Sequence, residues 1–159
     1  MSHHLDGIDI EILNHLQENG RAQRNKLAEI VGLSVPSVSE RMRKLEERGL
    51  IQSYNAILDA KKFHYDITAY MFVEVEGSEN YPEFIENCRQ HSEVLECHSI
   101  TGEGSHILKV RTKNTSSFEK LLSQIQSWKG VHKTRSNIVL SSFKETRAIT
   151  VKVEDDVVI

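Results

Sequence analysis

Side chains suited to binding nucleic acid gather on one side of a helical pattern between residues 34 and 48. Arginine and lysine reach phosphates and the guanine edge in the DNA major groove, and serines near a helix N-terminus donate to phosphates or base edges. An ordinary solvated helix with interspersed Glu and Arg is the alternative from these residues alone. The predicted DNA-binding residues are Ser34, Ser37, Glu40, Arg41, Arg43, Lys44 and Arg48.

An abrupt corner within residues 25–49 favours DNA binding over that alternative. Apolar residues repeat at helical spacing on both sides of the corner: Leu27, Ile30 and Val31 before it, and Val38, Met42 and Leu45 after it. Gly32 can adopt the left-handed conformation that closes a helix, and Ser34 is a good N-cap for the next helix, with Pro36 in its first turn. The pattern predicts a helix-turn-helix.

The remaining reactive residue types form no catalytic or metal-binding pattern. The eight histidines have no accompanying nucleophile, P-loop or HExxH motif. Cys88 and Cys97 lack a CxxC spacing and follow no secretory signal, so we expect reduced, partly buried thiols rather than a disulfide or metal site. His106 is the exception, because its titration near neutrality would couple ligand binding to pH. We expect no enzyme, no metal and no cofactor.

Composition describes an ordinary globular protein with an uneven charge distribution. The chain has 159 residues, 38% hydrophobic and 27% charged, with a formal net charge of -3. Between Arg21 and Lys62 there are nine Lys or Arg against five Asp or Glu, whereas the remainder has eleven against eighteen. Basic charge is therefore concentrated around the predicted reading helix, where it would release DNA counterions. No apolar run is long enough to cross a bilayer, so a cytoplasmic location is expected.

The chain changes from helical periodicity to strand alternation at Ile67. Before this point, residues 5–16 predict a first helix, and residues 50–63 predict either a small wing hairpin or a simple linker. After it, the pattern predicts strand, helix, strand, strand, helix, strand, with a last strand over residues 146–153. This order is typical of a ferredoxin-like split βαβ sandwich.

The first strand of this sandwich predicts a dimer. Its free face carries Tyr70 and Phe72, and an open sheet with exposed aromatic residues usually finds a second sheet. A face-to-face dimer with two-fold symmetry would present two reading helices to one palindromic DNA site.

Several motifs in family order resemble the leucine-responsive regulatory protein and asparagine-operon regulator (Lrp/AsnC) family, also called feast/famine regulators. They are LDGIDIEILNHLQENGR, LAEIVGLSVPSVSERMRKLEERGLIQSYNAILD, ECHSITGEGSHILKVR and GVHKTRSNIVLSSFKE. The resemblance covers nearly the whole chain. It implies an α+β protein in which an N-terminal winged helix-turn-helix is linked to a C-terminal ferredoxin-like βαββαβ domain of the RAM or ACT type. Such a domain senses ligands and builds homodimers, which often assemble to octamers or hexadecamers.

We expect a DNA-binding domain over residues 1–52, a wing or linker over 53–66, and an effector-binding and dimerisation domain over 67–159. The family's ligand site lies between protomers, beside the loop joining the second and third strands of the sensing domain. The resemblance therefore implies effector binding, by an amino acid or a relative, at Thr101, Gly102, Glu103, Gly104, Ser105 and His106.

This loop departs from the pattern of amino-acid-responsive relatives, which carry an aspartate and an aromatic residue where this chain has Ser105 and His106. A carboxylate can hold the ammonium group of an amino acid, whereas a serine supplies no charge. Either Glu103 substitutes, the ligand differs, or no effector binds. The expected function is a DNA-binding transcription regulator modulated by a small molecule. The alternative is an effector-independent protein of the same fold that wraps DNA.

Overall fold

The protein, described over residues 5–152 by a computed structural model, divides into two compact units. The first unit contains the chain up to Ile57 and again from Glu145, and the second contains residues 58–144. Each unit has its own apolar core. We call them the helical unit and the sheet unit.

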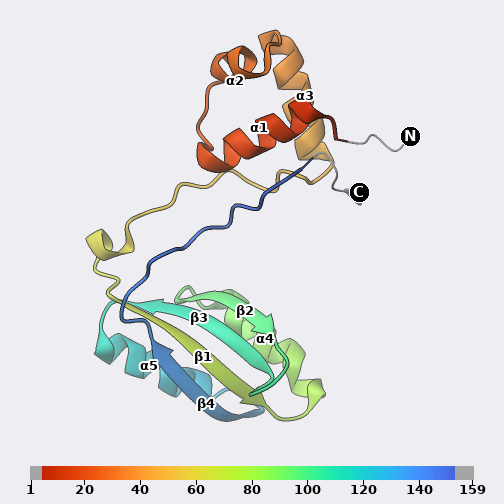
Figure 1. Cartoon of the computed structure of the whole chain (residues 1–159). Coiled ribbons are helices and arrows are strands. Elements are labelled where there is room, and N and C mark those ends of the chain that lie inside the picture. The colour runs from red at the N-terminus through yellow and green to blue at the C-terminus, as the bar shows by residue number, and fades with distance from the viewer. Residues whose placement is uncertain (1–4, 153–159) are drawn as a thin grey trace. The chain divides into compact units, whose positions relative to one another are not determined.

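The helical unit is built from α1 (Gly7–Glu18), α2 (Arg24–Val31) and α3 (Val35–Glu47) (Figure 1). Helix α1 begins with a capping box, in which the Asp6 side chain accepts from the Asp9 backbone N–H at 2.9 Å and the Asp9 carboxylate accepts from the Asp6 N–H. The three helices bury one shared apolar cluster, so the predicted three-helix unit is confirmed. Its buried members are Leu5, Ile10, Ile12, Leu13, Leu16, Leu27, Ala28, Val38, Met42 and Leu45.

The segment after α3 forms no hairpin. No strand occurs between Leu50 and Asp59, and the chain continues into the short 3-10 helix η1 (Ala60–Phe63). Tyr54 turns back toward α3, where its hydroxyl donates to the Glu46 carboxylate at 2.9 Å. Of the two alternatives for this region, a wing or a linker, the structure shows a linker.

The strand expected over residues 146–153 is not formed in its described part. The segment instead runs along α1, where the Gln17 side-chain amide donates to the Ile149 carbonyl and accepts from the Ile149 N–H, both at 2.8 Å. Asn14 donates to the Val151 carbonyl at 3.2 Å, and Val151 packs against the helical core. The expectation of a further strand was wrong, because polar side chains on a helix here satisfy backbone groups that a sheet would otherwise pair.

The sheet unit has the predicted order of strands and helices. Its strands are β1 (Ile67–Val75), β2 (Val94–Ser99), β3 (His106–Thr112) and β4 (Val131–Ile138). Its helices are the short η2 (Ser78–Asn80), then α4 (Tyr81–Gln90) and α5 (Thr115–Gln126). The four strands form one sheet in the order β2-β3-β1-β4, with every neighbouring pair antiparallel. The ferredoxin-like arrangement is confirmed.

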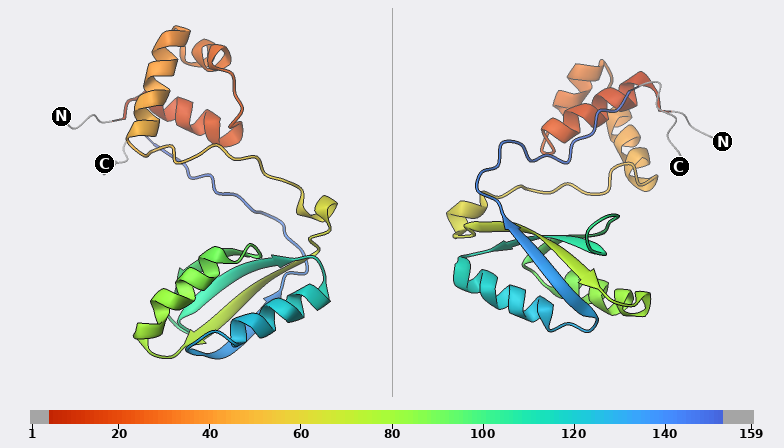
Figure 2. Two further views of the ribbon diagram at one scale, coloured as in Figure 1. Left: turned by 180° about the vertical axis from the view of Figure 1, so that it is seen from behind. Right: turned by 60° about the horizontal axis from the view of Figure 1, so that its bottom comes forward.

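Helices α4 and α5 cover one face of the sheet, as Figures 1 and 2 both show. Alternate residues of β1 point into this layer and are fully or almost fully buried: Ala69, Met71, Val73 and Val75. Phe84 of α4 lies against Trp128, with ring centroids 5.7 Å apart. The helical side of the sheet therefore holds the apolar core of this unit.

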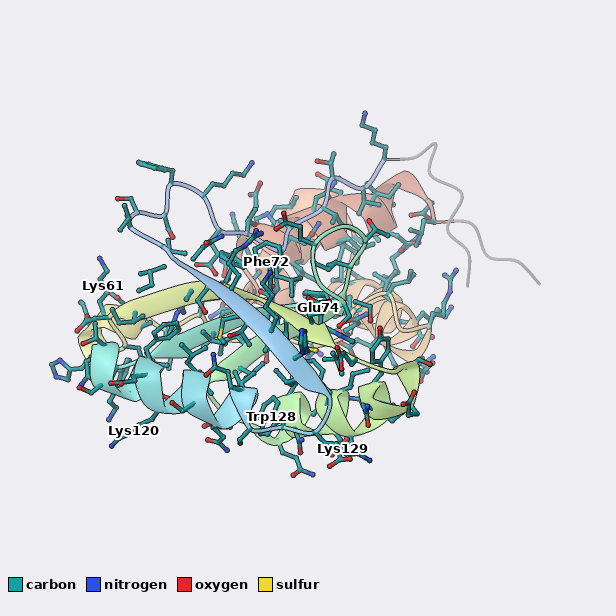
Figure 3. All side chains as sticks on the ribbon, turned by 90° about the horizontal axis from the view of Figure 1, so that it is seen from below. Lys61, Phe72, Glu74, Lys120, Trp128 and Lys129 are labelled. Atoms are coloured by element: carbon teal, nitrogen blue, oxygen red, sulfur yellow. The ribbon has the colours of Figure 1, made fainter. Side chains whose placement is uncertain are left out.

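The opposite face of the sheet mixes aromatic and charged side chains. Phe72 and Glu74 lie on the side of β1 away from the helices, whereas Trp128 lies on the helical side (Figure 3). The Arg135 guanidinium lies 4.8 Å from the centre of the Phe72 ring, a cation–π distance. Tyr70 is 38% exposed beside β3. This open face is amphipathic rather than uniformly apolar.

Candidate nucleic-acid interface and effector loop

The corner between α2 and α3 is set by the residues that the sequence singled out. Gly32 ends α2 with φ 68°, the left-handed conformation that glycine adopts without steric cost. Ser34 then caps α3, because its hydroxyl accepts from the Ser37 N–H at 3.3 Å and lies 2.8 Å from the Ser37 hydroxyl. The predicted turn is confirmed, and both serines lie exposed at the start of α3.

Helix α3 has one buried side. Val38, Met42 and Leu45 are at most 6% exposed, and they attach the helix to the rest of the unit. Five of the predicted DNA-binding residues lie on the exposed surface and Arg48 is half-buried; the exposed five are Ser34, Ser37, Glu40, Arg43 and Lys44. The exposed side therefore presents hydroxyl, acidic and basic groups together.

The exposed cations of α3 are already paired within the helix. Arg43 forms ion pairs with Glu40, at 2.7 Å, and with Glu47. The Lys44 ammonium lies 3.6 Å from the Glu40 carboxylate. The hydrogen bond from Arg43 holds the pKa of Glu40 down at about 2. Exposed pairs of this kind are weak in water, so phosphates can replace the carboxylates as partners.

Arg41 differs from the expectation of an outward DNA contact. Its guanidinium lies 2.8 Å from Asp6 and 2.7 Å from Asp9, and its side chain is only 30% exposed. Partial burial opposes ionisation of Asp6, but hydrogen bonds from the Asp9 backbone and from Arg41 outweigh it and lower the pKa of that carboxyl. Arg41 therefore joins α3 to the N-terminus of α1, which helical spacing alone could not reveal because Asp6 and Asp9 are distant in sequence.

The loop between β2 and β3 carries the predicted effector residues. It is closed by a hydrogen bond from the Ile100 N–H to the Ser105 carbonyl at 3.1 Å. Thr101, Gly102 and Glu103 are exposed, and Gly104 is half-buried. Gly104 has φ 86°, and a Cβ there would lie 3.0 Å from the Val73 carbonyl oxygen. This glycine is therefore needed for the close approach of the loop to β1.

Ser105 points inward and ties the loop to β1. Its N–H donates to the Val73 carbonyl at 2.9 Å, and its hydroxyl accepts from the Val75 N–H at 3.0 Å. The same hydroxyl lies 3.2 Å from the Val73 carbonyl oxygen and 2.8 Å from Nδ1 of His106. These contacts use the polar groups of Ser105 within the fold.

His106 is completely buried. Its ring lies 4.8 Å from the Tyr81 ring and 4.9 Å from the Phe84 ring, and Nε2 is buried without a hydrogen-bond partner. Burial lowers the pKa of His106 below its usual 6.5, because a charged imidazole would lose hydration. The ring belongs to the core, so the titration of His106 is moved below its usual range rather than set by solvent.

Glu103 is the exposed carboxylate of this loop, and it forms an ion pair with Arg135 of β4. Arg135 lies opposite Phe72 in the β1–β4 register and covers the Phe72 ring. The sequence interpretation missed Arg135. Strict alternation from Val131, which packs against the core, would place Arg135 on the helical side, and a register shift between β1 and β4 turns it to the open face. Phe72, Glu103 and Arg135 together border the outer side of the loop.

Two further results limit the chemistry of the described part of the chain. Over residues 5–152, no three His, Cys, Asp or Glu side chains are grouped so that they could hold a metal ion. Among the helices of those residues, none has the length and apolar character needed to span a membrane.

Comparisons with known proteins cover almost the whole chain. A family model described as the Lrp/AsnC ligand binding domain matches residues 68–149, and one described as winged helix-turn-helix DNA-binding matches residues 5–52. The HTH-type transcriptional regulator FL11 of Pyrococcus horikoshii is 35% identical over 148 residues, which cover 93% of this chain and 97% of that protein.

A second relative and one solved structure agree with these matches. The leucine-responsive regulatory protein of Escherichia coli is 35% identical over 154 residues, covering 93% of this chain and 92% of the relative. The crystal structure of a transcriptional regulator of Neisseria meningitidis in complex with L-Met has a TM-score of 0.87 and 31% identity, and the match covers 91% of this chain and 96% of that one.

Proposed function

The chain belongs to the Lrp/AsnC family of DNA-binding transcription regulators, which are not enzymes, and on that premise we propose that α3 reads double-stranded DNA. In this proposal α3 lies in the major groove. Its serines contact phosphate or base edges near the helix start, while Arg43, Lys44 and Arg48 contact phosphates or guanine. Glu40 can accept a hydrogen bond from a cytosine amino group. Such a regulator would act in the cytoplasm.

The observation that carries this proposal is the division of α3 into a buried apolar side and an exposed polar side. Val38, Met42 and Leu45 fix the helix, so its outer residues can be presented without loss of the core. Arg41 supports this presentation by holding α3 to α1 through Asp6 and Asp9. We assign Arg41 a positioning role rather than a base contact.

The experiment is a DNA-binding titration with the region upstream of the protein's own gene, repeated over a series of salt concentrations. The double variant Arg43→Ala/Lys44→Ala should lose roughly 10- to 100-fold in affinity, and the salt slope should fall by about two for each protomer bound if both side chains contact phosphates. Glu47→Gln should strengthen binding, because it removes one competing partner of Arg43.

A matched control removes two exposed lysines from the sheet unit, Lys120→Ala/Lys129→Ala (Figure 3). This control changes the net charge equally but leaves α3 intact. Unchanged affinity and salt slope in the α3 variant, or an equal loss in the control, would reject α3 as the reading helix.

We further propose that a small molecule, an amino acid or a relative, binds at the 101–106 loop between protomers. Thr101, Gly102 and Glu103 are the members of the loop that reach solvent, with Arg135 beside Glu103. Ser105 and His106 would support the loop rather than touch the ligand. The similar regulator from Neisseria meningitidis was crystallised in complex with L-Met, so methionine should be among the first ligands tested for binding.

An effector-independent, DNA-wrapping protein is the second candidate function. Two observations favour it. Position 105 is a serine, which has no carboxylate to bind an ammonium group, and the Glu103 carboxylate is already paired with Arg135. A thermal-shift panel of all amino acids separates the two, because a ligand that binds only the folded state raises the melting temperature. A shift that Glu103→Gln abolishes supports the effector site, whereas no shift with any amino acid supports the architectural role.

We propose that the open sheet face forms the homodimer, and that dimers assemble to an octamer. Tyr70 and Phe72 supply aromatic surface there, and the exposed Glu74 on the same side of β1 supplies a polar contact. Tyr70→Glu should dissociate the dimer in analytical ultracentrifugation. Phe63→Glu, which changes an exposed aromatic residue of η1, should not.

A further inference from the structure

Two side-chain amides of α1 hold residues 146–152, which we call the C-terminal strap. The Gln17 amide donates to the Ile149 carbonyl and accepts from the Ile149 N–H, both at 2.8 Å. Asn14, one turn earlier in α1, donates to the Val151 carbonyl at 3.2 Å. The two amides also contact each other, because Nε2 of Gln17 lies 3.4 Å from the Asn14 side-chain oxygen. Three backbone groups of the strap are therefore bound by one connected pair of side chains.

The two amides take the place of a neighbouring strand. A glutamine amide offers a donor and an acceptor, as a peptide group does. In an extended segment, alternate residues direct their backbone groups to the same side, so Ile149 and Val151 both face α1. The Val151 side chain packs half-buried against the helical core, whereas the Ile149 side chain is 71% exposed. The strap is thus bound through its backbone and one apolar side chain.

The strap gives the helical unit a second covalent connection to the sheet unit. The chain leaves the helical unit after Ile57 and returns to it at Glu145. The first connection follows residues 50–59, which form no helix or strand. Docking of the strap closes a ring through the helical unit, the linker, the sheet unit and the returning segment. A closed ring leaves two units less freedom to move against each other than a single connection does.

We propose that Asn14 and Gln17 are positioning residues for DNA reading, because the strap that they hold restricts the movement of the helical unit relative to the sheet unit. This inference rests on the proposed function, in which a homodimer presents two reading helices to one DNA molecule. Asn14 and Gln17 act through the strap and do not contact the DNA.

The restriction matters at the second half-site. Once one helical unit of a dimer is bound, the other meets its half-site at an effective concentration set by the connections within the dimer. A slack connection spreads the second reading helix over a larger volume and lowers that concentration. Binding to a single half-site uses one helical unit, so it does not depend on the strap.

The first measurement asks whether the strap is docked in solution. Hydrogen exchange of the full-length protein, followed by NMR, should show a protected Ile149 amide, because that N–H donates to Gln17. In Asn14→Ala/Gln17→Ala the protection should be lost, while the amides of α1 stay protected because alanine is the best helix former. Equally fast exchange of the Ile149 amide in the unmutated protein and in the double variant would overturn the proposal.

The second measurement compares DNA that has two half-sites with DNA that has one. The probe is the region upstream of the protein's own gene, first footprinted and then altered so that one half-site is scrambled. Asn14→Ala/Gln17→Ala should lose roughly 3- to 10-fold in affinity for the two-site DNA and bind the one-site DNA as tightly as the unmutated protein. Ile149→Pro, which removes the N–H donor from the strap and leaves α1 intact, should do the same.

Gln90→Ala is the matched control, because it also removes an exposed glutamine hydrogen bond, the one that Gln90 donates to Glu86 on α4 at 2.9 Å. It should change neither affinity. Unchanged binding of the two-site DNA by the strap variants, or equal losses on both DNAs, would overturn the proposal while leaving α3 as the reading helix. Failure of the unmutated protein to bind either DNA would overturn the proposed function, and this inference with it.

Discussion

The outer side of α3 and the 101–106 loop present their polar side chains in different ways. On α3, Glu40, Arg43 and Lys44 all reach solvent and pair only with other exposed groups. In the loop, Glu103 reaches solvent, whereas Ser105 and His106 turn into the fold. One region exposes its polar groups to solvent, and the other uses several of them to hold its own structure.

The difference follows from backbone geometry. A helix with one buried stripe must direct its remaining side chains outward, because residues repeat every 3.6 positions around one axis. A loop has no fixed period, and here two glycines with positive φ, Gly102 and Gly104, set its path. The direction of each loop side chain therefore depends on the strand that the loop meets.

The largest loss of stability is expected from a substitution at Gly104, where the loop lies against β1. Gly104→Ala should destabilise the sheet unit by roughly 3 kcal/mol, because the positive φ is strained for alanine and the new Cβ would meet the Val73 carbonyl oxygen. Denaturant unfolding followed by fluorescence of Trp128, the one tryptophan of the chain, measures this. Gly102→Ala is the control: its Cβ meets nothing within 4 Å, so a loss as large as that of Gly104→Ala would contradict the steric explanation.

The next effect tests whether all cations of α3 behave alike. Arg41→Ala should cost roughly 1 to 2 kcal/mol of unfolding free energy in the helical unit, because it leaves the partly buried Asp9 carboxylate without its partner. Arg43→Ala, which breaks exposed pairs, should change stability by less than about 0.5 kcal/mol. Far-UV circular dichroism during denaturation measures both. Equal losses would show that Arg41 is no more structural than Arg43.

A smaller effect is expected at Ser105. Ser105→Ala should cost about 1 kcal/mol, because the Val75 N–H loses the hydroxyl that it donates to. Thr101→Ala in the same loop is the matched control and should be nearly neutral, since Thr101 is exposed. Trp128 fluorescence again reports unfolding. If the two variants lose stability equally, Ser105 does not anchor the loop.

The smallest effect is a pH dependence caused by His106. Its pKa is lower in the folded protein than in the unfolded chain, where it is near 6.5, so the unfolded state binds more protons in the window between the two values. Stability should therefore fall as the pH drops through this window and recover as the pH rises. His106→Phe should flatten the profile of melting temperature against pH. The control His132→Asn, at an exposed histidine, should leave the profile of melting temperature against pH unchanged. If His106→Phe also leaves the profile unchanged, His106 does not cause the pH dependence.

Regular elements were predictable from the chain because their signals are local. The glycine and serine at the α2–α3 corner and the alternation of β1 each act within a few residues, and the helix-turn-helix and the ferredoxin-like order are confirmed. The C-terminal segment was mispredicted for the same reason. Its alternating pattern resembles a strand, but Gln17 and Asn14 on α1 satisfy its backbone instead.

The sequence by itself determined the helices of residues 7–47, the order of strands and helices over residues 67–138, and the polar composition of α3, because helical and strand periods depend on neighbouring residues. Only the tertiary structure decided that Arg41 binds Asp6 and Asp9, and that Ser105 and His106 face inward. These contacts join residues from different elements. Their formation depends on how helices and strands pack, and no local spacing specifies that packing.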